Sequence, residues 1–294
     1  MHPQAADILD RLALTPRRGK AAPRLAFGLK SLDTRLEGGL IQGALHEIRA
    51  PTARDIGAAT GVTLGLLATA AAQSGRDRVM WISDPAAGVD AGVLYPDGIA
   101  QYGLDPSCIT LVTPVDLQTA LWAADEAARC PDLVAVVLHV RGNPRQLDRV
   151  ATRRLMLRAQ TSGCTVLVLR QSGVEEASAA HTRWRVEARP SPPDPGFPQG
   201  LGLPQMALTL ERSRTGQTGG WPVIWNPKHK AFAHGSKHIY TDPQVSVDRP
   251  AVSGHRPDRA APLGHVVDLR RASTRRAPDD CGADGQECPT DRGA

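Results

Sequence analysis

Five short, almost continuously apolar runs alternate with longer segments of helical periodicity, and this alternation limits what the chain can fold into. The runs are Ala44–Ile48, Val79–Ser83, Ile109–Val112, Leu133–Val140 and Thr165–Arg170. Such runs are typical of strands that are buried on both faces, as in parallel sheets. The segments with helical periodicity are Ala58–Gln73, about Val93–Tyr102, Leu117–Arg129 and Leu147–Thr161. The sequence therefore predicts an α/β fold, an open and mostly parallel sheet with helices on both faces.

The pattern changes after the fifth run. The segments His181–Arg189 and Gln205–Arg214 alternate apolar with polar residues, which is typical of half-exposed antiparallel strands. A further strand is expected around Val223–Trp225, after a Gly-rich turn. The intervening segment Pro190–Gly200 is so rich in Pro and Gly that we expect an exposed loop without regular structure. Antiparallel strands are thus expected at the C-terminal end of the core.

Composition divides the chain into three regions, 1–26, 27–240 and 241–294. Residues 5–14 of the first region predict a short amphipathic helix, and a flexible basic linker follows it. The second region is the α/β core. The third holds 8 Arg and 9 acidic residues but too few apolar side chains to offset the entropy of ordering, so we expect a disordered tail. Within it, Gly264–Arg276 places Arg270 and Arg271 beside apolar residues, which leaves open either a partner-binding segment or a solvated tail.

Charge and cysteine spacing restrict the class of protein. The formal net charge is +5, which permits contact with nucleic acid without establishing it. The five cysteines lack the paired spacing of a zinc site, so we expect no metal and a reduced, cytoplasmic protein. They are Cys108, Cys130, Cys164, Cys281 and Cys288. The sequence shows no run of 18 or more apolar residues and no signal-peptide pattern, so we expect no membrane partner.

The junction between the first apolar run and the first long helix is where a nucleotide-binding α/β protein carries its phosphate loop. A working Walker A loop, G-x-x-x-x-G-K-[ST], surrounds the phosphates with backbone N–H groups, and its Lys and hydroxyl group neutralise charge and hold magnesium. Counting without a gap places the loop on "APTARDIG", which begins at Ala50. Asp55 then replaces the second glycine, Ile56 the lysine and Gly57 the Ser or Thr. Arg54 is the single cation of this segment, and it stands at the wrong position.

Other side chains of nucleotide hydrolysis are also replaced or isolated. The fourth apolar run has Leu138–His139 where a Walker B strand would carry the Asp that orders magnesium. Asp84 ends the second run near the position of an activating carboxylate, and Gln171 follows the fifth run like a phosphate-sensing glutamine. Without the lysine and the second acid, these groups have no bound nucleotide to act on. We therefore expect no ATP hydrolysis, no catalytic residue and no cofactor.

Longer segments resemble known families. The segment "FGLKSLDTRLEGGLIQGALHEI", from Phe27 to Ile48, resembles the one that leads into the first core strand of RecA-type ATPases, and the resemblance extends to about Trp225. With the N-terminal helix, the lysine-free loop and "LERSRTGQTGGWPVIWN" (Leu210–Asn226), the chain is similar to the ImuA family of RecA-like proteins. The resemblance implies a non-catalytic accessory protein of SOS-induced, error-prone translesion DNA synthesis. It also implies two partners, namely ImuB, an inactive Y-family polymerase homologue, and an error-prone DnaE-type polymerase. RecA and DNA are further candidate partners.

Two other functions remain open. One is an SOS cell-division inhibitor of the SulA type, which is related to the same fold but is much shorter. The other is a RecA-like, DNA-dependent ATPase with atypical phosphate contacts. The position of RecA's first DNA-binding loop is shortened to "RGNPRQLD". The position of the second loop, Ser172–Ala180, carries Glu175 and Glu176, whose charge repels phosphate.

Four arginines of the predicted helix Leu147–Thr161 form two pairs at a spacing of one helical turn. The pairs are Arg149 with Arg153 and Arg154 with Arg158. Either they form a solvated face whose aliphatic stems cover apolar neighbours, or one pair contacts DNA phosphates or an acidic surface of a polymerase partner.

Overall fold

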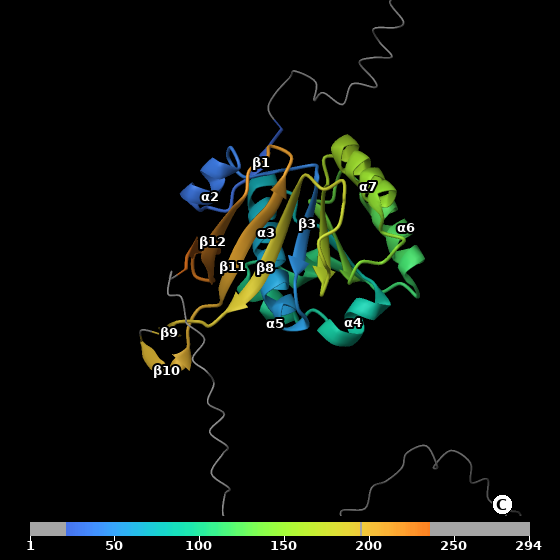
Figure 1. The fold of residues 1–294 in the computed structure, drawn as a ribbon. Coiled ribbons are helices and arrows are strands. Elements are labelled where there is room, and N and C mark those ends of the chain that lie inside the picture. Colours follow the sequence, from blue (N-terminus) through green and yellow to red (C-terminus); the bar gives the residue numbers. More distant parts are fainter. Residues whose placement is uncertain (1–21, 195, 236–294) are drawn as a thin grey trace, which may run out of the picture. The chain divides into compact units, whose positions relative to one another are not determined.

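A nine-stranded sheet is the centre of the fold, and the computed structural model describes residues 22–194 and 196–235 of the chain (Figure 1). The strands across this sheet are, in order, β13 (Ala231–His234), β12 (Gly219–Asn226), β11 (Gln205–Ser213), β8 (Thr182–Arg189), β3 (Leu45–Ala50), β7 (Thr165–Gln171), β6 (Ala135–Arg141), β4 (Val79–Ser83) and β5 (Ile109–Val112). A small antiparallel pair, β1 (Arg24–Leu25) and β2 (Leu40–Ile41), precedes it. Strand β1 thus begins before the boundary that composition suggested at residue 27.

The strand directions confirm the predicted fold class. Strands β5, β4, β6, β7, β3 and β8 run parallel to their neighbours in the sheet. Strand β8 then pairs antiparallel with β11, which pairs antiparallel with β12, and β12 does so with β13. The sheet is therefore mostly parallel, with antiparallel strands added at the C-terminal end of the core.

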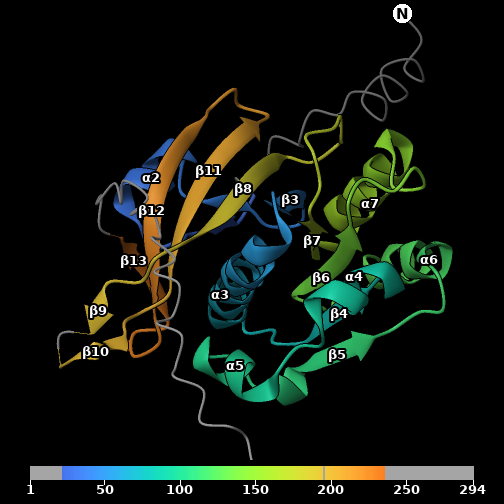
Figure 2. The same cartoon turned by 60° about the horizontal axis from the view of Figure 1, so that its bottom comes forward.

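The helices cover both faces of the sheet. They are α2 (Lys30–Arg35), α3 (Ile56–Ser74), α4 (Pro85–Ala91), α5 (Pro96–Gln101), α6 (Leu117–Ala127) and α7 (Arg149–Ser162), with short 3-10 turns η1 (Ala53–Asp55) and η2 (Pro106–Cys108). Helix α3 packs on one face, and α6 and α7 pack on the other (Figure 2). One apolar layer joins α3 to side chains such as Ile48 and Trp184, and the second joins α6 and α7 to Leu45 and Val168. Alternate residues of one strand therefore enter different layers.

Helix α3 lies at the centre of the first layer. Its sequence is apolar on almost all sides, as expected of a helix that the core surrounds. It ends where Gly75 adopts a left-handed conformation with φ of 68° and donates its N–H to Ala71 O. With its preceding turn, the segment Ala53–Ser74 is long and apolar enough to cross a membrane by length and composition. In this fold the segment is the central core helix, and much of its surface packs against the sheet.

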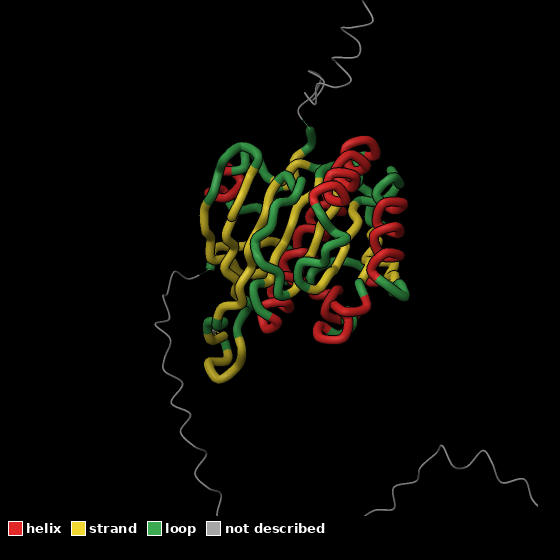
Figure 3. The backbone as a smooth tube through the Cα atoms, turned by 45° about the vertical axis from the view of Figure 1, so that its right-hand side comes forward, coloured by secondary structure: helices red, strands yellow, loops and turns green. Residues whose placement is uncertain are grey.

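Two local expectations differ from the structure. The segment Pro190–Gly200 is not free of regular structure, because β9 (Pro193–Asp194) and β10 (Phe197–Leu201) pair antiparallel as a hairpin outside the nine-stranded sheet (Figure 3). The helix expected over Val93–Tyr102 is present as the shorter α5, and α4, which precedes that range, was not expected; each of the two begins at a proline. Proline is favourable in the first helical turn, where its missing N–H has no partner to lose. The predicted helix at residues 5–14 and the predicted tail lie outside the described residues.

Candidate functional site

The connection between β3 and α3 is short and already folded on itself. Strand β3 ends at Ala50, and the 3-10 turn begins at Ala53, so Pro51 and Thr52 alone separate the strand from helical backbone. Helix α3 then starts at Ile56. A phosphate loop instead leaves several residues open between strand and helix, so that their N–H groups converge on the ligand. The Ala50–Gly57 segment does not form such an open loop.

The carboxylate of Asp55 occupies the inside of this turn. The side chain is 4% exposed, and its Oδ2 accepts hydrogen bonds from the backbone N–H of Thr52 at 3.2 Å and from the Thr52 hydroxyl at 2.5 Å. Its Oδ1 accepts from the N–H of Ala188 at 3.0 Å. Ala188 lies on β8 beyond the last residue that pairs with β3, so Asp55 satisfies a backbone donor that the ending strand leaves open. The carboxylate of Asp55 therefore lies where a phosphate loop would bind the phosphate groups of a nucleotide.

The neighbours of Asp55 point elsewhere. Arg54 is exposed, and no ion pair with it occurs among residues 22–194 and 196–235. Ile56 is partly buried and packs against the apolar layer around α3. Gly57 faces open space, since an added Cβ would meet nothing within 4 Å. Ile56 and Gly57 therefore provide no cation for a triphosphate, and the cation of Arg54 is exposed to solvent.

A cavity of about 270 Å³ lies beside the first turns of α3, next to the ends of β4, β5 and β6. Ligands of open α/β sheets commonly bind at this edge, outside the carboxyl ends of the strands. The walls are mainly apolar or small, and Trp81, Tyr102 and Gly61 are among them. Neither Lys nor Arg lines the cavity. The cavity is therefore poorly suited to a polyanion.

The residues at the ends of β6, β7 and β4 lie near this edge. His139 lines the cavity, is 5% exposed, and has no hydrogen-bond partner for Nε2 among the described residues. Burial lowers its pKa to about 4, so the ring is neutral at pH 7. Gln171 is fully buried beside it, and Asp84 precedes α4 and is also buried. A neutral imidazole cannot replace the magnesium-binding carboxylate of a Walker B strand.

A buried ion network fixes the opposite face of the sheet. Glu47, 1% exposed, accepts from Arg170 Nε at 2.5 Å and from the Ser178 hydroxyl at 2.7 Å, and it lies 3.5 Å from Arg183 Nε. These groups come from β3, β7, β8 and the loop Ser172–Ala180. These residues were not predicted from the sequence. A charged residue inside, or at the end of, an otherwise apolar run could have indicated them, because a charged group that is buried requires partners.

The same network holds the two glutamates of the Ser172–Ala180 loop. Glu175 pairs with Arg183 Nη1 at 3.0 Å, and Glu176 accepts from Asn143 Nδ2 at 2.7 Å. The Asn143 side chain also accepts from the N–H of Val174 at 2.7 Å. The loop is therefore tied to the core at several points. Its two glutamates bind the side chains of Arg183 and Asn143. The loop therefore differs from one that is free to close around a DNA strand.

The four arginines of α7 separate into two pairs with different surroundings. Arg154 and Arg158 form ion pairs with Asp125 of α6, at 3.2 and 3.5 Å, and Arg129 shares the same carboxylate at 3.0 Å. Arg149 and Arg153 are exposed and have no ion pair within the described part of the chain. Arg270 and Arg271 lie outside the described residues.

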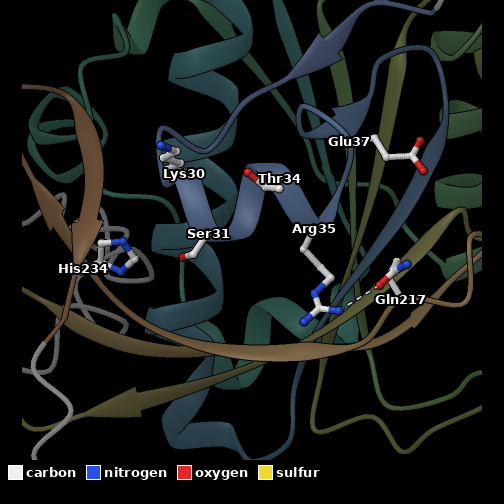
Figure 4. A pocket seen from close by; sticks show the side chains of 7 residues that line it. All are labelled: Lys30, Ser31, Thr34, Arg35, Glu37, Gln217 and His234. Atoms are coloured by element: carbon white, nitrogen blue, oxygen red, sulfur yellow. Dashed lines mark hydrogen bonds between the residues drawn. The ribbon is translucent and has the colours of Figure 1, made fainter.

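A larger, open pocket of about 710 Å³ lies at the other side of the fold, against α2 (Figure 4). Lys30, Arg35, Glu37 and His234 are among its lining residues, and Arg35 donates to the Gln217 side chain at 3.2 Å. Glu37 pairs with Arg24 at 3.3 Å. Most of the side chains that line this pocket are exposed. We assign no chemistry to it.

Metal ligands and reactive thiols do not gather in the part of the chain that the structure describes. No group of three or more His, Cys, Asp or Glu side chains there could hold a metal ion. Cys108, Cys130 and Cys164 are free, and burial raises the pKa of Cys164 to about 12, which makes it an inert thiol. Cys281 and Cys288 lie outside the described residues.

Comparisons with known proteins find similar chains among curated proteins and among solved structures. Protein ImuA of Caulobacter vibrioides, in two strains, is 29% identical over 211 residues, which cover 68% of this chain and 82% of that protein. No family model matches the chain. Among solved structures, the RadB recombinase aligns with a TM-score of 0.49 and 18% identity, over 72% of this chain and 100% of that one. The chain is thus similar to Protein ImuA over most of the length of both chains.

Proposed function

We propose that this protein is a non-catalytic, RecA-like accessory protein of SOS-induced, error-prone translesion DNA synthesis. In this proposal it acts in the cytoplasm, without a cofactor, together with an ImuB-like inactive Y-family polymerase and an error-prone DnaE-type polymerase. Similarity to ImuA over most of both chains supports the biological role. The internal chemistry of the β3–α3 connection supports the absence of catalysis.

The observation that carries the non-catalytic part is the buried carboxylate of Asp55. A triphosphate at the start of α3 would meet this anion, while the N–H groups of Thr52 and Ala188 are already engaged by it. Repulsion between like charges is strong in a partly buried site because little solvent screens it. Arg54, the nearby cation, is exposed and lies outside the turn's interior. ATP binding would therefore require the turn to open and Asp55 to lose its partners.

Exposed apolar side chains around α6 support the proposal that the protein binds partner proteins. Trp122 of α6 is 64% exposed, and Val115, just before the helix, is 88% exposed. A large aromatic ring in water is costly, and such residues are enriched at the centres of protein interfaces. In the proposed protein, which binds no nucleotide, these exposed surfaces are available to bind a partner protein.

Two other functions remain to be tested, a DNA-dependent ATPase and a division inhibitor. Isothermal titration with MgATP, in the presence and in the absence of single-stranded DNA, tests for the ATPase. We expect no saturable heat and no phosphate release, because several charge-assisted contacts are missing and each is worth about 1.5–3 kcal/mol. Binding in the low micromolar range, or turnover that DNA stimulates, would refute the non-catalytic assignment.

Affinity capture from DNA-damaged cells tests the partners. We expect the tagged protein to retain the ImuB-like protein and the DnaE-type polymerase, and Trp122→Ala to reduce that retention. Glu126→Ala, a neighbouring exposed change on α6, is the matched control. Capture of the division protein FtsZ in place of polymerase components would instead support the SulA-like function and overturn this one.

A further inference from the structure

Four arginines gather where α7, the end of the Ser172–Ala180 loop and the end of β11 meet. Two come from the first turns of α7, and two come from the end of β11 and the residue after it; they are Arg149, Arg153, Arg212 and Arg214. The loop connects the two sides. The N–H of Ala179 donates to the hydroxyl of Thr152 on α7 at 3.1 Å, and the Ala179 carbonyl accepts from Arg214 Nη2 at 3.1 Å. The carbonyl of Ser178 accepts from Arg212 Nη1 at 2.9 Å.

The four guanidinium groups keep much of their donor capacity. All four residues are exposed, and none of them forms an ion pair with a residue of the described ranges. Arg212 and Arg214 each use one nitrogen on a backbone carbonyl, whereas a guanidinium has five N–H donors. The adjacent Arg154 and Arg158 differ, because each forms an ion pair with Asp125. Within the described residues, the arginines of α7 that lack an ion pair thus lie on one side of the helix.

The arrangement is electrostatically unfavourable for the protein alone. Burial, together with repulsion from Arg153 and Arg212, lowers the pKa of Arg214 below its ordinary value. Arg149 is the first residue of α7, and the positive end of the helix dipole disfavours a cation there. Glu175 and Glu176 do not compensate, since they pair with Arg183 and Asn143 inside the loop network, and the nearby carboxylate of Asp148 caps α7 by accepting from the N–H of Ala151. An external anion at this surface would relieve the repulsion.

We propose that Arg149, Arg153, Arg212 and Arg214 bind the phosphate backbone of DNA. The inference rests on the proposed function and gives it a point of contact with the nucleic acid. Arginine suits phosphate because its planar group can donate two parallel hydrogen bonds. Between the two pairs lie Thr152, Ser178 and Ala179, which offer neither base-reading side chains nor the large apolar anchors of a protein interface. The contact is therefore independent of base sequence.

Fluorescence anisotropy with labelled oligothymidine, and with a labelled duplex, tests the proposal across about 50 to 200 mM salt. The test variant is Arg149→Ala with Arg153→Ala, which breaks no ion pair in the described structure. The control is Arg154→Ala with Arg158→Ala, which removes the same charge from the same helix. We expect the test variant to weaken DNA binding about tenfold, and to flatten the salt slope by about 0.7 per lost contact on the single strand or about 0.9 on the duplex. The control should bind nearly as the unchanged protein does.

Arg214→Ala, at the residue after β11, provides a second, independent variant. Its effect on DNA binding should be in the same direction, and thermal unfolding checks that the Ala179 contact is not needed for the fold. Equal weakening by the test and control variants would mean that net charge alone matters, and would overturn the proposal. Unchanged DNA binding in the test variant would also overturn it, as would loss of polymerase capture with DNA binding intact. Because anisotropy measures DNA alone, failure here leaves the ATP titration and the capture experiment to decide the proposed function separately.

Discussion

Asp55 is a single residue that joins three parts of the fold, namely the end of β3, the start of α3 and the edge of β8. Replacing it by Ala leaves the N–H groups of Thr52 and Ala188 without their acceptor. A hydrogen bond to a charged group contributes about 1.5–3 kcal/mol. We therefore expect Asp55→Ala to lower the free energy of unfolding by that amount in urea titrations. Arg54→Ala, at the exposed neighbour, should change it by no more than about 0.5 kcal/mol. Equal effects of the two changes would contradict the internal role of Asp55.

Two glycines of helix α3, Gly57 and Gly65, are expected to affect stability in opposite directions when each is replaced by alanine. A Cβ at Gly65 would lie 2.6 Å from Phe232 Cζ and 2.9 Å from Trp225 Cζ3, whereas a Cβ at Gly57 meets nothing within 4 Å. Ala is otherwise favoured over Gly in a helix by about 0.5–1 kcal/mol. We expect Gly57→Ala to raise the melting temperature slightly. Gly65→Ala should lower it, because overpacking a core costs about 1–3 kcal/mol. If both variants were stabilised, α3 would not pack against β12 and β13 as described.

Stability against acid is a property of the whole molecule, and buried histidines set part of it. His46, His139 and His181 each have a pKa of about 4, lowered chiefly by burial from an ordinary value of 6.5. The unfolded chain therefore binds more protons than the folded one between these two values. The contribution of the neutral histidines to the free energy of unfolding is fully present above about pH 6.5 and is lost as the pH falls toward 4. For fully buried His46, the loss between pH 7 and pH 5 is about 2 kcal/mol.

Urea unfolding at pH 7 and pH 5 measures this loss, and His46→Asn identifies one contributor. The variant is expected to be less stable at pH 7, because His46 bonds the Thr182 hydroxyl and the Ile41 carbonyl, each at 2.8 Å. Its stability should nevertheless change less between the two pH values than that of the unchanged protein. An identical pH dependence in both proteins would show that His46 does not titrate as described.

Periodicity alone was enough to predict the architecture. The five apolar runs coincide closely with β3, β4, β5, β6 and β7, and the alternating segments coincide with β8 and β11. Such patterns are local, because burial on one or two faces determines which successive residues must be apolar. The β9–β10 hairpin and helix α4 were not predicted. Their Pro- and Gly-rich sequences permit a turn, a short strand or a short helix, and packing chooses among them.

The sequence by itself determined that no lysine stands at the phosphate-loop position and that an acid stands within it. Only the tertiary structure decided what that acid does, since Ala188, which donates to it, is 133 positions away along the chain. The same holds for the arginines of α7. They are one type of residue at one spacing, yet Arg154 and Arg158 form ion pairs with Asp125 of α6, whereas Arg149 and Arg153 form none with the described residues. Local sequence fixes which groups carry charge, whereas the packing of distant elements fixes which charges meet a partner, because electrostatic and hydrogen-bond energies depend on distance in space.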